Sequence, residues 1–198
     1  MPDSLYFPLF HGIVSVSIFT PASLWLIFMS EGAAAFACIF ASAAVHESGH
    51  WFFIRLAGEK VTLFRIEPFG GMMTYTTSKC TYGDEMLIAS GGIVFNLLAA
   101  SAASAAFAFF KNVYLLLFIF SCFFFALVNA FPIKGNDGYR FVCLALCRRT
   151  DAEKAKKAAD VLSVCGALIL ASAAVYILYL SDFNNGLCII FLLAAMRG

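Results

Sequence analysis

The feature that most constrains this chain is a series of apolar stretches, each about as long as a bilayer is thick. An α-helix needs about 20 residues to cross the hydrocarbon core. Five stretches come near this length, at residues 13–29, 33–57, 86–110, 113–131 and 161–180. A sixth, at 187–196, is shorter and spans only if residues 183–186 extend it. Hydrophobic residues make up 62% of the chain and charged residues 13%, unlike a soluble domain. We therefore predict an all-α, multi-pass membrane protein with about six transmembrane helices.

The first stretch is expected to be a retained transmembrane helix. Residues 1–10 contain no Lys or Arg, so the basic segment of a cleaved signal peptide is missing. Pro21 is expected to kink this helix, because proline removes a backbone donor and clashes with the preceding turn.

The basic residues predict the orientation in the membrane. If both termini are cytoplasmic, the two long inner loops and the C-terminus carry all but one of the 13 Lys and Arg residues. Only Lys111 then lies on the outer side. This bias follows the positive-inside rule and favours cytoplasmic termini.

One connection between the apolar stretches is expected to contain strands. Residues 61–75 alternate loosely between apolar and polar side chains around Pro68 and the pair Gly70-Gly71. The pattern predicts a β-hairpin, or two short strands at the membrane surface, with the two glycines in the turn.

A second connection, residues 150–160, is expected to be a solvated helix that leads into the next span. Thr150 and Glu153 have the spacing of a capping box. Glu153 and Lys157 have the spacing of a favourable ion pair.

Residues 41–58 place two histidines and a glutamate inside an apolar helix. His46 and His50 are four residues apart, so they share one helix face and their ring nitrogens can converge on one metal ion. Glu47 projects about 100° from His46, beside such a pair, where it could accept a proton from water. This is the H-E-x-x-H arrangement of zinc hydrolases.

The alternative is a pair of helix histidines that neighbouring groups satisfy, without a metal. Glu47 argues against it. A charged carboxylate in the middle of a transmembrane helix costs on the order of 3 kcal/mol on insertion scales, and an apolar helix has no packing need for one.

A catalytic zinc site usually has three protein ligands and one open position. His11, the remaining histidine, lies at the start of the first stretch, where an interfacial histidine without a metal is expected. Residues 129–140 offer a better candidate, since Asp137 follows a helix break at Pro132 and its carboxylate can turn inward. The alternative is an ordinary turn, because Asn-Asp-Gly favours turns.

These motifs together resemble the site-2 protease family of intramembrane metalloproteases. The resemblance covers roughly residues 35–140 and is carried by His46, Glu47, His50, Asn129, Pro132, Asp137 and Gly138. "PFGG" at 68–71 is similar to the family's membrane-associated β-hairpin. Gly92 and Asn96 are similar to its G-x-x-x-N helix. Gly135, Asn136 and Tyr139 depart from the family pattern, which bears on the substrate and the subfamily.

The resemblance implies one zinc ion per chain, bound by His46, His50 and Asp137, with Glu47 as the general base. Asn96 and Asn129 are hypothesised to hydrogen-bond the substrate backbone or the oxyanion, with helix–helix contact as the alternative. Gly70 and Gly71 are hypothesised to belong to a hairpin that holds the substrate as an added strand.

The expected protein is a single transmembrane metalloprotease domain over residues 1–198, without a PDZ or CBS domain. Its expected activity is cleavage of a membrane-embedded or membrane-tethered protein near the cytoplasmic side of a bacterial cell membrane. The resemblance is greatest to the sporulation proteases that process a pro-sigma factor, and it implies a membrane regulator or inhibitor but no nucleic acid. The alternatives are a membrane metal transporter, since His and Asp residues also line ion paths, and an inactive relative.

Overall fold

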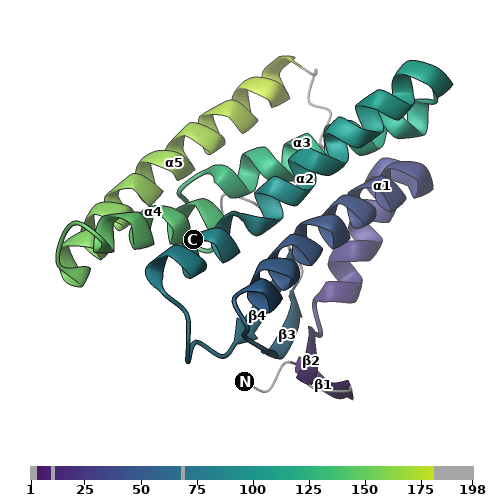
Figure 1. The fold of residues 1–198 in the computed structure, drawn as a ribbon. Coiled ribbons are helices and arrows are strands. Elements are labelled where there is room, and N and C mark those ends of the chain that lie inside the picture. Colours follow the sequence, from purple (N-terminus) through teal and green to yellow (C-terminus); the bar gives the residue numbers. More distant parts are fainter. Residues whose placement is uncertain (1–3, 10–11, 68–69, 181–198) are drawn as a thin grey trace. The chain divides into compact units, whose positions relative to one another are not determined.

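The computed structural model describes residues 4–9, 12–67 and 70–180. Its elements are β1 (Ser4–Leu9), β2 (Gly12–Ser17), α1 (Thr20–Leu56), β3 (Val61–Glu67), β4 (Gly70–Tyr75), α2 (Tyr82–Phe110), α3 (Val113–Ala130), α4 (Asp137–Cys147) and α5 (Ala152–Leu180) (Figure 1). The chain divides into two compact units, residues 1–126 and 127–198. His11 and the sixth apolar stretch lie outside the described residues.

The first unit contains a four-stranded sheet with the strand order β1-β2-β3-β4. Strands β2 and β3 are parallel, so the whole of α1 serves as the crossover between them. The other two pairings are antiparallel. The predicted strands within 61–75 are confirmed as β3 and β4. The prediction of a mostly helical chain is confirmed, but the predicted hairpin is part of a larger sheet, because two more strands join it.

The predicted position of the two glycines in that hairpin is also wrong. Gly70 pairs with Glu67 and Gly71 pairs with Ile66, so both glycines belong to β4. The connection between the strands falls at residues 68–69, which lie outside the described residues.

The first predicted transmembrane helix, at 13–29, is wrong in its first part. Residues 13–17 belong to β2, and Ser15 in the middle of that strand is fully buried. Helix α1 begins at Thr20, with Pro21 in its first turn, where a missing N–H costs nothing. The predicted kink at Pro21 is therefore absent. The break occurs instead at Gly32, whose φ of 78° and ψ of 168° are non-helical.

Helices α2 and α3 pack through small side chains. Ala100, Ala103, Ile119 and Cys122 form a buried cluster, against which Phe107 and Phe118 pack. Small residues let helix backbones approach closely, as is usual between transmembrane helices.

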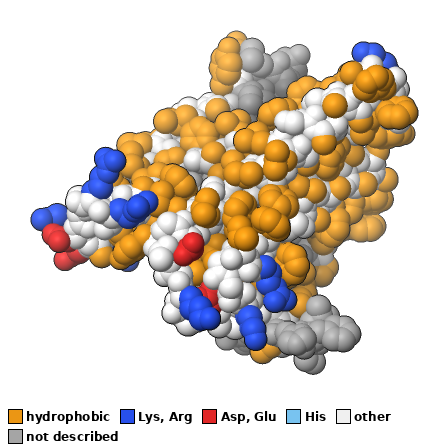
Figure 2. Space-filling view, in the orientation of Figure 1, with side chains coloured by type: hydrophobic (Ala, Val, Ile, Leu, Met, Phe, Trp, Pro, Cys, Tyr) orange, Lys and Arg blue, Asp and Glu red, His pale blue; other side chains and the backbone are white. Residues whose placement is uncertain are grey.

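The described helices α2 and α3 are long and apolar enough to cross a membrane. The six predicted spans are not confirmed as a set, and those beyond α2 and α3 stay predictions. Large apolar side chains such as Leu98, Phe109 and Phe120 are exposed, and Figure 2 shows apolar side chains over most of the visible face. Exposed apolar surface on this scale is expected of a chain whose solvent is lipid.

The second unit contains the end of α3, the helix α4 and the helix α5. Residues 137–147, for which no helix is expected from the sequence, form α4. The Tyr139 hydroxyl donates a 2.8 Å hydrogen bond to the Asp160 carboxylate and so joins α4 to α5.

The helix that was expected over 150–160 is the first part of α5. Its Glu153–Lys157 ion pair is confirmed, with 2.8 Å between nitrogen and oxygen. The predicted capping box at Thr150 is wrong, because α5 begins at Ala152 and the Ala155 N–H binds the Asp151 carbonyl. A capping box does exist at the start of α2, between Thr81 and Asp84.

Candidate metal centre

The two motif histidines point their Nε2 atoms at the same place. His46 and His50 lie one turn apart on α1, and their Nε2 atoms are 3.2 Å apart. Two nitrogens at about 2.0–2.1 Å from one tetrahedral zinc ion would be about 3.3 Å apart. The pair therefore already has the spacing that a shared zinc ion requires.

The other ring nitrogen of His50 is anchored to the backbone of α2. Its Nδ1 lies 2.8 Å from the carbonyl oxygen of Ile88. A carbonyl can only accept, so Nδ1 carries the proton and Nε2 presents its lone pair. An Nδ1–H bonded to a backbone carbonyl is the usual way in which a protein orients a metal-binding histidine.

The other ring nitrogen of His46 is anchored to Asn96. The Asn96 Nδ2 lies 3.3 Å from His46 Nδ1, and the buried Asn96 Oδ1 has no hydrogen-bond partner. The two ends of an amide are assigned from their partners. Rotating this amide by 180° lets Oδ1 accept the Nδ1–H of His46, which leaves the His46 Nε2 lone pair directed at His50. The residues present thus fit a metal ion.

Two glycine contacts bring α1 and α2 close enough for these anchors. A Cβ atom added to Gly92 would overlap the His46 imidazole, and one added to Gly49 would overlap the Gly91 carbonyl. Gly92 and Asn96, one turn apart on α2, therefore act on the same ring. The first makes room for it and the second binds it.

Glu47 lies on the same helix and reaches the sheet. Its Oε1 accepts a 3.2 Å hydrogen bond from the backbone N–H of Gly71 in β4. The side chain is half-buried. A carboxylate beside the histidine pair, fixed through one oxygen, is placed to accept a proton.

Asp137 and Asn129 belong to the second unit. Asp137 is the first residue of α4 and is half-buried, while Asn129 lies in the last turn of α3 and is buried. Asp137 therefore begins a helix and is not part of an isolated turn. The segment before it is fixed by Asn136, whose side-chain Nδ2 donates a 2.9 Å hydrogen bond to the Val128 carbonyl.

Gly138 is needed where α4 meets the end of α3. A Cβ atom there would overlap the Ala130 carbonyl. In the Asp-Gly pair of the motif, Asp137 thus supplies a carboxylate, and Gly138 lets the backbone of α4 approach the end of α3.

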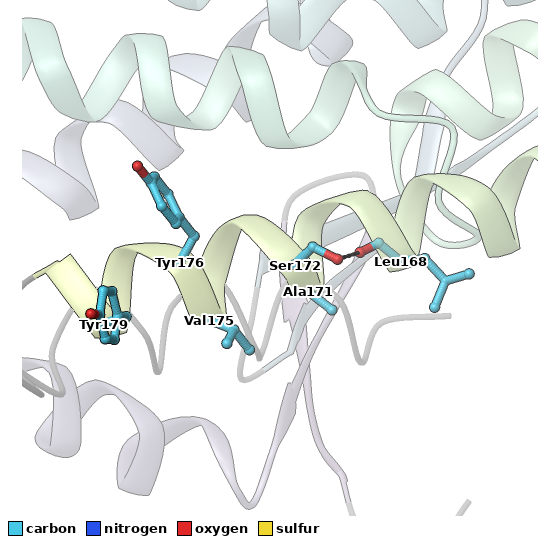
Figure 3. Close-up of a pocket in the computed structure, with 6 residues that line it drawn as sticks. All are labelled: Leu168, Ala171, Ser172, Val175, Tyr176 and Tyr179. Atoms are coloured by element: carbon cyan, nitrogen blue, oxygen red, sulfur yellow. Dashed lines mark hydrogen bonds between the residues drawn. The ribbon is translucent and has the colours of Figure 1, made fainter.

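The cavity in Figure 3 is apolar, unlike the candidate metal centre. One face of α5 lines it, and its residues are Leu168, Ala171, Ser172, Val175, Tyr176 and Tyr179. The Ser172 hydroxyl is already used, since it donates a 2.8 Å hydrogen bond to the Leu168 carbonyl. This apolar helix face is suited to lipid.

The backbone groups of the site could not be predicted from the sequence. The Ile88 carbonyl and the Gly71 N–H carry no signature, because every residue has such groups and only the fold brings them to the motif. The G-x-x-x-N spacing did single out Gly92 and Asn96 in the sequence. It did not indicate that these two residues contact His46.

The sequence matches no known family model and no curated protein sequence. The fold, by contrast, is similar to a solved structure, the site-2 protease from Methanocaldococcus jannaschii. The TM-score is 0.63 and the identity 21%, over 98% of this chain and 94% of that one. The chain therefore has a fold like that of a site-2 protease.

Proposed function

We propose that this protein is an intramembrane zinc metalloendopeptidase. The observation that carries the proposal is the histidine pair of α1. Its Nε2 atoms are 3.2 Å apart, each Nδ1 faces an anchor on α2, and the Glu47 carboxylate stands on the same helix. The likeness in fold to a site-2 protease supports it.

Asp137 is the proposed third ligand. Two imidazoles and one carboxylate form a donor set that catalytic zinc sites use, and His46, His50 and Asp137 supply these donors. A zinc ion bound by them would acidify a water molecule and polarise the scissile carbonyl.

The residues of the chain then have separate tasks. Glu47 takes a proton from the attacking water and delivers it to the leaving amine, so that the peptide C–N bond breaks and new carboxyl and amine termini form. Asn96 and the Ile88 carbonyl hold the two imidazoles in the tautomer that binds metal.

An extended substrate has an open strand edge available. Strand β4 is an edge strand of the described sheet. The Thr74 carbonyl and the Thr76 N–H face β3, where they bond Thr62 and Lys60. By alternation, the backbone groups of Met73 face outward, where an added strand could pair. Cleavage needs such an extended peptide, because a helix uses its carbonyls internally.

The proposed substrate is a membrane-tethered protein that is cut near the cytoplasmic boundary, with release of its soluble part. A sporulation pro-sigma factor as the substrate, and a membrane regulator or inhibitor as a further partner of the protease, fit the sequence resemblance. Asn129 is proposed to contact the substrate backbone.

The test uses the purified full chain in liposomes with a panel of tagged single-span reporter proteins. We expect a cut that a chelator abolishes and zinc restores, with product termini mapped by mass spectrometry. Asp137→Ala should lose both zinc and cleavage, whereas Asp151→Ala, which changes an exposed carboxylate of the same unit, should keep both. Zinc flux into the liposomes without any cleavage would contradict the proposal and indicate a transporter.

A further inference from the structure

One contact in the first unit involves none of the proposed zinc ligands. The Glu47 carboxylate of α1 accepts the backbone N–H of Gly71 through Oε1, at 3.2 Å. The two residues are 24 positions apart in the sequence, so only the fold brings them together.

Gly71 leaves no space for a side chain on this side of the strand. A Cβ atom there would lie 2.6 Å from Cδ of Glu47, 2.7 Å from Oε1 and 2.9 Å from Oε2. Ordinary contacts of a Cβ atom begin near 3.4 Å. Alanine at this position would therefore move the carboxylate, which is the far end of a flexible side chain, and leave the backbone in place.

The N–H of Gly71 is available because it faces away from β3. Thr74 and Thr76 direct their backbone groups towards β3, so the alternation of the strand turns those of Gly71 outward. Glu47 uses the donor that an edge strand otherwise leaves unpaired. One carboxylate oxygen is thereby fixed, while the other keeps its lone pairs for a proton.

We propose that Gly71 is a positioning residue for Glu47. Its N–H fixes the carboxylate, and its missing Cβ gives the carboxylate its place against β4. The role rests on the proposed function, in which Glu47 is the general base. A base held by a rigid strand keeps its geometry through the reaction, and a displacement of about 1 Å can cost on the order of 100-fold in rate.

The contact itself is tested without any activity, by melting the metal-free full chain in detergent. Wild type, Gly71→Ala, Glu47→Ala and the double variant form a cycle. We expect Gly71→Ala to lower the melting temperature by about 2–4 °C when Glu47 is present. The shift should vanish in the Glu47→Ala background, where the added methyl has room. Gly83→Ala is the matched control, since its Cβ would meet only the Thr81 hydroxyl, at 3.5 Å. An equal shift in both backgrounds would overturn the proposal.

The positioning role is tested on a reporter that the wild-type chain cleaves. Gly71→Ala should lower kcat at least about tenfold. Its KM and its zinc content should stay at the wild-type values, and Gly83→Ala should cleave normally. The substitution Glu47→Asp shortens the base by one methylene. When it is combined with Gly71→Ala, the loss in kcat should be smaller than the product of the two separate losses. Wild-type or faster turnover by Gly71→Ala would overturn the role. A chain that cleaves no reporter would overturn the proposed function, and the melting cycle would still decide the contact.

Discussion

Among individual residues, Asn96 has a clear role besides its hypothesised contact with substrate, which is to orient the imidazole of His46. It is fully buried, and its side-chain amide faces the Nδ1 atom of His46. A buried amide beside a metal-binding imidazole sets the tautomer of the ring. This contact supports a positioning role for Asn96, whereas its hypothesised contact with substrate stays a prediction.

Zinc binding should depend on the hydrogen-bond acceptor at position 96. Asn96→Ala is expected to weaken zinc affinity about 10–100-fold, because His46 loses the group that orients it. Asn96→Asp keeps an acceptor and should retain most of the affinity. Competition with a fluorescent zinc chelator measures both variants. Wild-type affinity in Asn96→Ala would show that the ring needs no such partner.

At the scale of elements, the outer edge of β4 connects the sheet to substrate binding. Met73 lies on that edge with its N–H directed outward, so a proline there removes a donor without breaking the β3–β4 ladder. Met73→Pro should reduce cleavage while zinc content stays unchanged, and Met73→Ala, which keeps the N–H, should cleave as wild type does. Normal turnover by Met73→Pro would exclude pairing of the substrate at this edge.

Glu59 joins the end of α1 to the segment after β4. Its carboxylate accepts hydrogen bonds from the Thr76 hydroxyl, from the Lys79 N–H at 2.7 Å and from the Ser78 hydroxyl. The bond from Thr76, followed by that from Lys79, lowers the pKa of the Glu59 carboxyl. The ionised carboxylate thus links the segment before β3 to the segment after β4, next to the end of the helix that carries the site.

This carboxylate predicts a pH dependence of stability. Because its folded pKa lies below the unfolded value of about 4.3, its contribution is complete above that pH and is lost as the pH falls through the lowered pKa. Metal-free wild type should therefore melt higher than Glu59→Gln at pH 7, and the gap should close in acid. Glu153→Gln, an exposed control, should show no gap. A gap of unchanged size as the pH falls from 7 into acid would contradict the assignment.

The elements show what could be predicted from sequence. Residues 61–75 alternate and carry glycines, which is a local signal, and they do form strands. Strand β2 could not be recognised in the sequence, because its alternating Val and Ser residues are followed almost directly by an apolar helix. Its pairing with β3 also joins segments about 50 residues apart, which only the folded chain brings together.

The candidate site divides in the same way. The histidines and Glu47 could be predicted, because helix geometry alone places them. Their anchors could not, since Ile88 acts through its carbonyl and Gly71 through its N–H. Helix α4 was missed because Gly135, Asn136, Asp137 and Gly138 are residues that favour a turn, although the last two are the first residues of the helix. That turn ends at Asn136, and the helix begins at the next residue.

For the whole molecule, the basic residues predict which side of the membrane the site opens to. If the termini are cytoplasmic as predicted, Arg55 lies at the inner end of α1, and His46, nine residues earlier, lies about 14 Å deeper at about 1.5 Å per residue. His50 is shallower. The basic residues around Asp137 are expected on the same side. Substrate should therefore be cut in the cytoplasmic half of the bilayer.

Cysteine labelling in intact cells tests this orientation. In a chain without its native cysteines, Lys134→Cys should react with a membrane-impermeant reagent only after the cytoplasmic face is exposed. Lys111→Cys, the matched control, should react from outside. Lys134 suits the test because it is exposed, whereas Gly135 has a φ of 93° and Gly138 has no room for a side chain. Labelling of Lys134→Cys from outside alone would reverse the topology and the release model.

The most direct measurement is reporter cleavage by zinc-loaded Glu47→Gln compared with zinc-loaded wild type. The substitution keeps the size of the side chain and the ligands but removes the proton acceptor. We expect one zinc ion per chain in both proteins and a loss of cleavage of at least about 100-fold in the variant. Undiminished cleavage by Glu47→Gln at full zinc content would contradict the proposed mechanism.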